Sequence, residues 1–243
     1  MSNIQDPGYF GEKSRRVRDM FGSIAARYDF LNHFLSANLD RRWRQICVRE
    51  MKKRTKAASP RILDIGCGTA DLSIAFSGLG PVIGCDFCHP MLCLGNKKIS
   101  GIHSVHPFDL IEADALMLPF PDKTFDMVVS AFVLRNLADI NQGLREMRRV
   151  LRPGGFLGIL DFGMPRWPLI AQLYRFYFLK VLPKAGKLLS GVDGPYGYLP
   201  DSVQAFPPIE ELKLKAEQAG LIRVEYRRLT AGVAVLLIGS CPD

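Results

Sequence analysis

The sequence predicts an α/β protein built on a mostly parallel β-sheet with helices on both faces. From residue 61 onward, short apolar runs typical of buried strands alternate with helical stretches. Strands that alternate with helices imply right-handed crossover connections, which cover both faces of a parallel sheet. The chain has 243 residues, 48% of them hydrophobic and 23% charged. This length and composition suit one sizeable globular domain with additions.

The elements can be assigned in order along the chain. Residues 13–56 read as helical because apolar side chains recur at three- and four-residue spacing. The strands expected next lie at residues 61–65, 81–86, 108–114, 125–131 and 156–162. The helices expected between them lie at residues 69–78, 89–98 and 141–151, the last closed by RPGG at 152–155. We therefore expect a helical N-terminal extension (1–56) and a main domain (57–243).

The C-terminal third departs from this alternation. Residues 164–205 are rich in aromatic residues and proline and are too long for a normal connection, so we expect a substrate-binding lid inserted in the main domain. A last helix at 209–220 leads to two apolar runs, 222–230 and 232–240. Because only a tight turn at Ala231–Gly232 separates these runs, they should pair as an antiparallel hairpin at one edge of a seven-stranded sheet.

Features of the whole chain exclude several classes of protein. The first twenty residues are polar and charged and hold no export signal, so the six cysteines are expected to be free thiols in a reducing cytoplasm. No second pair or histidine at ligand spacing completes a metal site around CDFC (85–88) and Cys93, so no metal is expected.

No run approaches the ~18 apolar residues that span a bilayer. The net charge of +8 is compatible with nucleic acid, an anionic membrane surface or an anionic ligand.

The segment RILDIGCGTAD (61–71) predicts a ligand site between the first strand and the next helix. Ligands of such sheets bind outside the carboxyl ends of the strands. Gly66 and Gly68 let the backbone approach a ligand with no side chain in the way. The third glycine of a dinucleotide-binding motif is replaced here by Asp71, whose carboxylate would repel a phosphate. The loop therefore argues against NAD.

Acidic residues at successive strand ends favour a cationic nucleoside without phosphate. S-adenosylmethionine (SAM) is such a molecule, and Asp64 and Asp71 supply carboxylates for its sulfonium and ammonium groups. Asp86, twenty residues beyond the first loop glycine, stands where a ribose-binding acid belongs. Asp114 is placed to accept a hydrogen bond from the adenine amino group, and Ser130 ends the fourth strand beside the same cleft. Each of these residues alone is equally well a helix cap or a turn residue, so the joint pattern carries the prediction.

Several segments of the chain resemble the C-methyltransferases of ubiquinone and menaquinone biosynthesis, which are class I SAM-dependent methyltransferases. The segments are FGSIAARYDFLNHFLSANLDRRWR (21–44), ILDIGCGTADL (62–72), SAFVLRNLADINQGLREMRRVLRPGG (130–155), LPKAGKLLSGVDGPYGYLPDSV (182–203) and LTAGVAVLLIG (229–239). The resemblance covers nearly the full length. Its YD-x-x-N and LRN segments are more diagnostic than the glycine loop, which many methyltransferases share.

The resemblance implies a Rossmann-like fold, SAM as the cofactor and C-methylation of a reduced, prenylated quinone ring. Demethylmenaquinol in menaquinone biosynthesis is the favoured substrate, and the benzoquinol of the ubiquinone pathway is the alternative. A nucleic-acid methyltransferase would ordinarily carry an RNA-binding module or an Asn-Pro-Pro-Tyr-type motif, whereas SAFV (130–133) stands in that place. A non-catalytic SAM-fold subunit is a third alternative, disfavoured by the intact cofactor loop and LRN. The SAM contacts implied by the resemblance are Thr69, Asp86, Asp114 with Ala115, and Ser130.

The chain departs from the family pattern at three places. Ala70 stands where a glycine is usual, and His33 where an aspartate is usual. Residues 191–195 (GVDGP) partly replace expected acidic residues. These departures concern contacts to the quinol more than contacts to SAM.

The expected chemistry points to catalytic residues after the fourth strand. Methylation of a ring carbon requires the sulfonium methyl in line with that carbon and negative charge on the ring, which comes from loss of the hydroxyl proton. A phenol has a pKa of about 10, so the site must remove this proton or stabilise the anion. Our hypothesis is that Arg135 stabilises the phenolate, Asn136 orients the hydroxyl and Tyr28 is the third member. A salt bridge to the following helix for Arg135 and core packing for Tyr28 are the structural alternatives.

The lid sequence predicts how a lipophilic quinol would be held. The apolar residues expected to line a groove for its prenyl tail are Trp167, Leu169, Leu173, Phe176, Tyr177 and Leu179. The basic residues expected to rest against anionic lipid are Arg166, Arg175, Lys180, Lys184 and Lys187. Simple packing of the lid onto the domain is the alternative. We thus expect a cytoplasmic protein at the membrane periphery that binds no nucleic acid, and a homodimer is compatible with the sequence.

Overall fold

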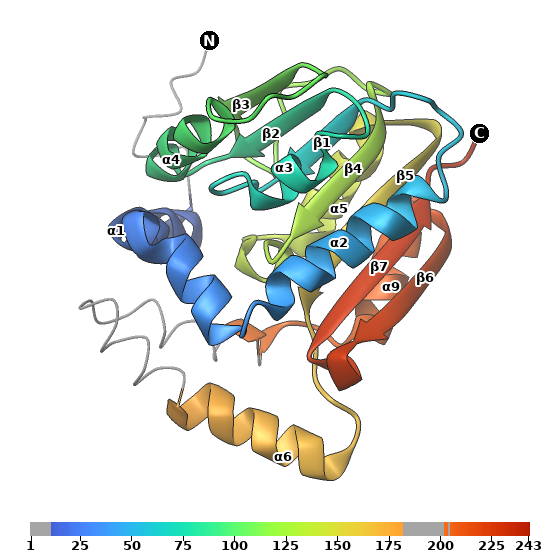
Figure 1. Ribbon diagram of the computed structural model, residues 1–243. Helices are drawn as coiled ribbons and strands as arrows, with labels where there is room; N and C mark the ends of the chain where they lie inside the picture. The colour runs from blue at the N-terminus through green and yellow to red at the C-terminus, as the bar shows by residue number, and fades with distance from the viewer. Residues whose placement is uncertain (1–10, 182–201, 204) are drawn as a thin grey trace.

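The computed structural model describes residues 11–181, 202–203 and 205–243, which contain a seven-stranded sheet in the order β3-β2-β1-β4-β5-β7-β6 (Figure 1). The strands are β1 (Ile62–Ile65), β2 (Val82–Asp86), β3 (Phe108–Glu112), β4 (Phe125–Ala131), β5 (Leu151–Phe162), β6 (Ile222–Leu229) and β7 (Ala234–Ser240). The first five strands pair in parallel, while β7 pairs antiparallel with both β5 and β6. The predicted parallel sheet with an antiparallel hairpin at its edge is confirmed.

Helices cover both faces of this sheet. They are α1 (Glu12–Leu35), α2 (Leu39–Lys52), α3 (Asp71–Phe76), α4 (His89–Ile99), α5 (Ile140–Val150), α6 (Pro168–Phe176) and α9 (Ile209–Gln218). Leu144 of α5 and Leu212 of α9 belong to one buried apolar cluster, and Trp43 of α2 and Phe76 of α3 belong to another. Because each cluster also includes strand side chains, the sheet is covered on both sides, which explains why every residue of β1 and β7 is buried. Among the described residues, none of the helices combines the length and hydropathy required to cross a membrane.

Two predicted boundaries are wrong. The stretch expected to be helical over 13–56 divides into α1 and α2, because Ala37 and Asn38 adopt positive φ angles of 50° and 60° between them. The RPGG segment (152–155) does not close α5 before the fifth strand but lies within β5. Phe125 of β4 pairs with Leu151 and Met127 with Phe156, so the segment is an irregularity of the strand itself.

The helix α6 stands apart from the layered body. It lies below the sheet in Figure 1, and none of its residues is buried. It continues into a short π-helical turn, η2 (Tyr177–Val181). Within the predicted lid, α6 is therefore held at the periphery, whereas Ser202 and Val203 near the end of the lid are buried.

The core formed by α5 can be tested by truncation. Leu144 is fully buried, whereas Leu214 on α9 is exposed. We expect Leu144→Ala to lower the free energy of unfolding by about 2–5 kcal/mol, because it removes buried methyl groups and leaves a cavity. Leu214→Ala is the matched control and should change it by less than about 0.5 kcal/mol. Equal losses in urea titrations of the two variants would show that the core is assigned incorrectly.

Candidate active site

A cavity opens at the carboxyl ends of the parallel strands, at the point where the strand order reverses around β1. Its empty volume is about 750 Å³, including the part open to solvent. The site residues that line it are Tyr28, Gly66, Gly68, Asp86, Asp114, Ala115 and Asn136. The end of each strand and the start of the loop after it supply most of this lining, as expected for a ligand site in a doubly wound sheet.

The helix α1 forms one side of the cavity. Ser14, Phe21 and Tyr28 all line it from this helix. The amine of Lys13 donates a hydrogen bond of 2.6 Å to the carbonyl oxygen of Leu137, which lies on the opposite rim. The N-terminal extension thus completes the cavity.

The glycine loop after β1 is shaped by close contacts. Gly66 has a φ of 67°, and a Cβ atom added to it would lie 2.4 Å from Cγ2 of Val133. Only glycine fits at this position, so the loop after β1 lies directly against the loop after β4. Ala70, at the position where the resemblance leads us to expect glycine, also has a positive φ, at 71°. Its backbone keeps the left-handed conformation that glycine adopts at no steric cost.

Asp86 and Asp114 present carboxyl groups at the cavity wall. Asp86 accepts hydrogen bonds of 2.8 Å from the backbone N–H groups of Gly68 and Cys88. Burial raises the pKa of Asp86 to about 6 and also raises that of Asp114. The N–H of Leu116 donates to Asp114 at 2.9 Å. The backbone fixes both carboxyl groups, so their remaining oxygen lone pairs are oriented before any ligand arrives.

Three other predicted cofactor residues lie behind this wall. Asp64 and Thr69 line a smaller hollow that Tyr28 also borders. Asp64 accepts a hydrogen bond of 2.5 Å from the hydroxyl of Ser73. Ser130 is fully buried and donates to the carbonyl oxygen of Ile65 at 2.9 Å, which ties β4 to the end of β1. Neither Thr69 nor Ser130 is among the residues that line the main cavity.

Asp71 was expected to offer its carboxylate to a cationic ligand, but basic side chains already surround it. Lys98 lies 2.7 Å from it, the Nε2 atom of His33 3.5 Å and Arg44 3.8 Å. Lys98 also contacts Asp29 at 2.6 Å, so the network ties α1 to the cofactor loop. A carboxylate paired with Lys98 and Arg44 is a structural element of this loop.

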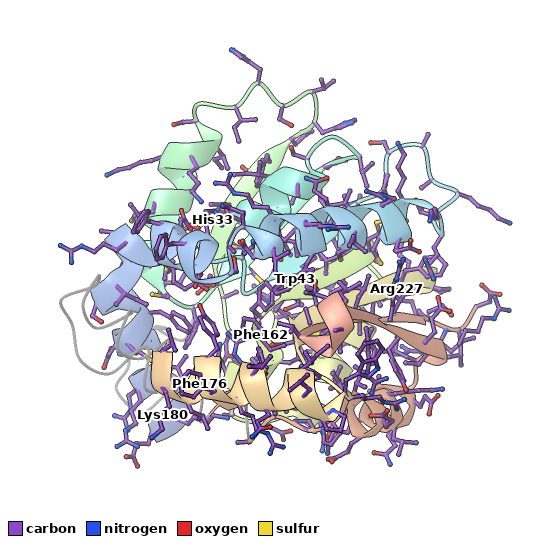
Figure 2. All side chains as sticks on the ribbon, turned by 60° about the horizontal axis from the view of Figure 1, so that its bottom comes forward. His33, Trp43, Phe162, Phe176, Lys180 and Arg227 are labelled. Atoms are coloured by element: carbon purple, nitrogen blue, oxygen red, sulfur yellow. The ribbon has the colours of Figure 1, made fainter. Side chains whose placement is uncertain are left out.

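His33 occupies the centre of the same network at the end of α1 (Figure 2). Its Nδ1 atom lies 2.7 Å from Asp40, and ligand atoms of His33, Asp40 and Asp71 all lie within 4.8 Å of one another. Such a group has the composition of a metal site. However, the guanidinium of Arg44 contacts Asp40 at 2.5 Å, and basic groups also surround Asp71, so positive charge is already supplied there.

The three predicted catalytic residues lie in different positions. Tyr28 and Asn136 line the main cavity. Burial raises the pKa of Tyr28, and the positive charge of Arg135 opposes that rise. Arg135 itself is buried behind the wall, where it forms an ion pair of 2.7 Å with Asp161. Arg135 thus forms a salt bridge, but its partner lies near the end of β5 and not on the following helix, as the structural alternative had it.

Asp161 was missed by sequence reasoning, although a signal was present. The segment FLGILDF ends the fifth parallel strand with an acidic residue, as the first two strands do with Asp64 and Asp86. Applying the strand-end rule to this strand as well would have found it.

The expected groove lining in the lid is largely wrong. Trp167 and Leu169 are 70% exposed, and Leu173 and Phe176 are 62% exposed. Of the six apolar residues, Leu179 lines a large groove beneath α6, together with Tyr174 and Arg175 of the same segment. Figure 2 shows Phe176 and Lys180 at the C-terminal end of α6. The expected contacts of Lys184, Lys187 and residues 191–195 lie outside the described residues.

The groove beneath α6 is formed mostly by residues that were not predicted. Its empty volume is about 1390 Å³, including open solvent. The residues opposite α6 are Phe162, Gly163, Met164, Val203, Phe206, Pro207, Pro208, Ile209, Glu210, Arg228 and Val235. They come from the end of β5, the start of α9 and the C-terminal hairpin, which are far apart in the sequence.

Sheet order, the glycine loop and the acids at the strand ends together define the fold of class I SAM-dependent methyltransferases. A solved SAM-dependent methyltransferase from Aquifex aeolicus superposes with a TM-score of 0.57 at 19% identity, covering 79% of this chain and 87% of that one. The model of the ubiE/COQ5 methyltransferase family matches residues 10–240, and the chain belongs to that family. The predicted resemblance is thereby confirmed.

Two relatives illustrate this membership. The chain is 43% identical over 233 residues to the ubiquinone/menaquinone biosynthesis C-methyltransferase UbiE of Geobacter sulfurreducens, covering 94% of this chain and 90% of the relative. It is 45% identical over 226 residues to the demethylmenaquinone methyltransferase of Thermus thermophilus, covering 92% of this chain and 100% of the relative.

The buried carboxyl group of Asp64 should make stability depend on pH. Burial raises its pKa from 3.8 to about 7. Between about pH 4 and pH 7 the native state holds a proton that the unfolded chain has released, so this group lowers the free energy of unfolding as pH rises, by up to about 1.4 kcal/mol per pH unit. Asp64→Asn removes the effect. We expect the stability of the variant minus that of the wild type, from urea titrations, to increase between pH 4 and pH 7; a constant difference would contradict the assignment.

Proposed function

We propose that the protein transfers a methyl group from SAM to a ring carbon of a reduced, prenylated quinone, with demethylmenaquinol as the substrate. The observation that carries the proposal is that Tyr28 and Asn136 line the same cavity as Asp86 and Asp114. A cofactor site and two groups suited to a ring hydroxyl therefore share one space. The names of the relatives from Geobacter sulfurreducens and Thermus thermophilus support the quinone substrate.

The cofactor half of the cavity suits a nucleoside that carries positive charge. Asp86 would accept from the ribose hydroxyls and Asp114 from the adenine amino group. Burial raises the pKa of both carboxyl groups. The ionised form of each group is therefore destabilised more by the loss of hydration than it is stabilised by the hydrogen bonds of its neighbours. A cationic ligand would compensate for this loss, whereas a phosphate would increase it. When bound, SAM supplies an electrophilic methyl group on its sulfonium.

The substrate half of the cavity would act on the ring hydroxyl. The amide of Asn136 donates to the carbonyl oxygen of Phe132 at 3.3 Å, and its Oδ1 atom is buried with no hydrogen-bond partner among the described residues. This oxygen is placed to accept from a ring hydroxyl. The phenol of Tyr28 lies in the same cavity and feels the positive charge of Arg135. A negative charge that develops on the ring oxygen would be stabilised by the same field.

A benzoquinol of the ubiquinone pathway is the second candidate substrate. The relative from Geobacter sulfurreducens is named for both ubiquinone and menaquinone biosynthesis. Both rings carry a hydroxyl next to the carbon that is methylated, so the same residues would serve either one.

We further propose that α6 rests on the membrane surface that holds the quinol. Its apolar side chains are exposed, as are Phe30 and Phe34 of α1, whose rings stack at 5.8 Å. Exposed apolar side chains gathered on one helix are typical of an interaction surface. Arg175 and Lys180 carry positive charge on the same segment, each worth about 1 kcal/mol near anionic lipid. The groove beneath α6 would take part of the prenyl tail, and the protein would be a cytoplasmic one on the inner face of the membrane.

The catalytic proposal is tested by incubating the protein with SAM and each reduced quinone, followed by mass spectrometry of the ring. We expect demethylmenaquinol to gain one methyl group. Asn136→Ala should lower kcat by roughly 10²-fold, because a group placed at the reacting hydroxyl is lost, while SAM affinity measured by calorimetry stays near that of the wild type. Absence of turnover on both quinol classes, or tight NAD binding with none of SAM, would overturn the proposal.

The membrane proposal is tested by flotation with vesicles that contain phosphatidylglycerol. We expect the wild type to float at low salt and less at high salt, since charge contributes to binding. The double variant Trp167→Ala with Phe176→Ala should float at least tenfold less, because each large apolar side chain contributes about 1.5–3 kcal/mol when buried. Leu214→Ala, an exposed leucine on α9, is the matched control. Equal flotation of the double variant and the control would refute the role of α6.

A further inference from the structure

The ion pair between Arg135 and Asp161 joins the turn Leu134–Asn136, which follows β4, to the end of the neighbouring strand β5. Nη1 of Arg135 lies 2.7 Å from Oδ1 of Asp161, which is fully buried. The same oxygen accepts a hydrogen bond of 2.8 Å from the backbone N–H of Phe162. The carboxylate is thus fixed to the backbone of β5, and it fixes the guanidinium in turn.

Two aromatic rings enclose the guanidinium. Its carbon lies 6.0 Å from the ring centre of Phe132 and 5.1 Å from that of Phe162. Phe132 lines the main cavity, and Phe162 lines the groove beneath α6. Figure 2 shows Phe162 next to Trp43, whose ring centre is 6.3 Å away. The charge of Arg135 therefore lies between the two spaces that the proposed substrate would occupy, with aromatic rings that exclude water.

The turn that carries Arg135 is strained. Phe132 has a φ of 64°, a conformation that bulky residues rarely adopt. Its N–H donates to the carbonyl oxygen of Leu160 at 2.7 Å, which ties the turn to β5. Strain of this kind costs on the order of 1–3 kcal/mol and persists only where the surrounding structure enforces it. Here it brings the side chain of Arg135 back over the end of β5, towards Asp161.

Three polar atoms at this place are buried without a hydrogen-bond partner among the described residues. They are Nε of Arg135, Oδ1 of Asn136 and Oδ2 of Asp161. Buried polar groups are nearly always paired in folded proteins, so unpaired ones need an explanation. One donor and two acceptors on consecutive or contacting residues indicate a site that is completed by a polar group of a ligand or by water.

We propose that Asp161 is a positioning residue for methyl transfer, which holds the guanidinium of Arg135 where its charge acts on the cavity. The inference rests on the proposed function. Asp161 touches neither the cavity nor the groove, so it acts through Arg135. A guanidinium that is already held in place does not have to move when the ring oxygen becomes negative. Its charge can therefore stabilise the transition state without a cost of rearrangement. The proposal adds no chemical step to the proposed methyl transfer.

A double-mutant cycle tests the inference. We would measure kcat, KM for SAM and thermal stability for the wild type, Asp161→Asn, Arg135→Met and the variant with both changes. Asp161→Asn keeps the shape of the side chain but loses its charge, and we expect it to lower kcat roughly 10- to 100-fold through displacement of the guanidinium. KM for SAM should stay within about twofold, because neither residue lines the cofactor half of the cavity.

The double variant gives the decisive comparison. If Asp161 acts through Arg135, kcat of the double variant should be no lower than that of Arg135→Met alone. The double variant is neutral, so it avoids the unpaired buried charge that destabilises each single variant. Additive losses, or a wild-type kcat for Asp161→Asn, would overturn the inference. If Asp161→Asn does not fold, Asp161→Ser, which is also neutral, replaces it in the cycle with the same expected and contradicting outcomes.

Glu146→Gln is the matched control. Glu146 is also a buried acid, paired with Arg149 at 2.7 Å, but it lies on α5 away from the cavity. Its variant should lose stability and keep kcat. A wild-type protein without turnover on either quinol would defeat the proposed function itself. Turnover by the wild type combined with additive losses would defeat only the role of Asp161.

Discussion

The site depends on one close approach, between the loop after β1 and the loop after β4. Gly66 leaves no room for a side chain against Val133. The N–H groups of Gly66 and Cys67 both donate to the carbonyl oxygen of Cys85, at 2.7 and 3.0 Å, which anchors the same loop to β2. As a result, the residues that would bind a cofactor and the Leu134–Asn136 turn that would act on a substrate share one cavity wall.

The charges around this cavity are arranged in two ways. On the outer side, Asp71 and Asp40 are neutralised by basic side chains of α1, α2 and α4. On the inner side, the described residues form no ion pair with Asp64 or Asp86, and burial raises the pKa of each, which the positive charge of Arg44 partly offsets at Asp64. The first group holds helices together, whereas in the second group burial disfavours the ionised carboxylate. A cationic nucleoside is the kind of ligand for which this second arrangement is stabilising.

The apolar surface of the protein also has two parts. The two clusters that flank the sheet are closed and account for the folded body. The helix α6 instead turns large apolar side chains to solvent over a groove that reaches Phe162. Since Phe162 contacts both Trp43 and the guanidinium of Arg135, the groove extends to the turn that carries Arg135.

The amino-acid sequence by itself determined the order of strands and helices, the hairpin at the sheet edge and the positions of Gly66, Asp86 and Asp114. These follow from local periodicity and from the rule that parallel strands end on one side. Only the tertiary structure decided that Asp161 holds Arg135, that Asp71 is neutralised and that α6 faces solvent. Each of these outcomes depends on which side chains from distant segments meet. The spacing of residues along one segment does not indicate which distant segment will contact it, because that contact depends on how the whole chain packs.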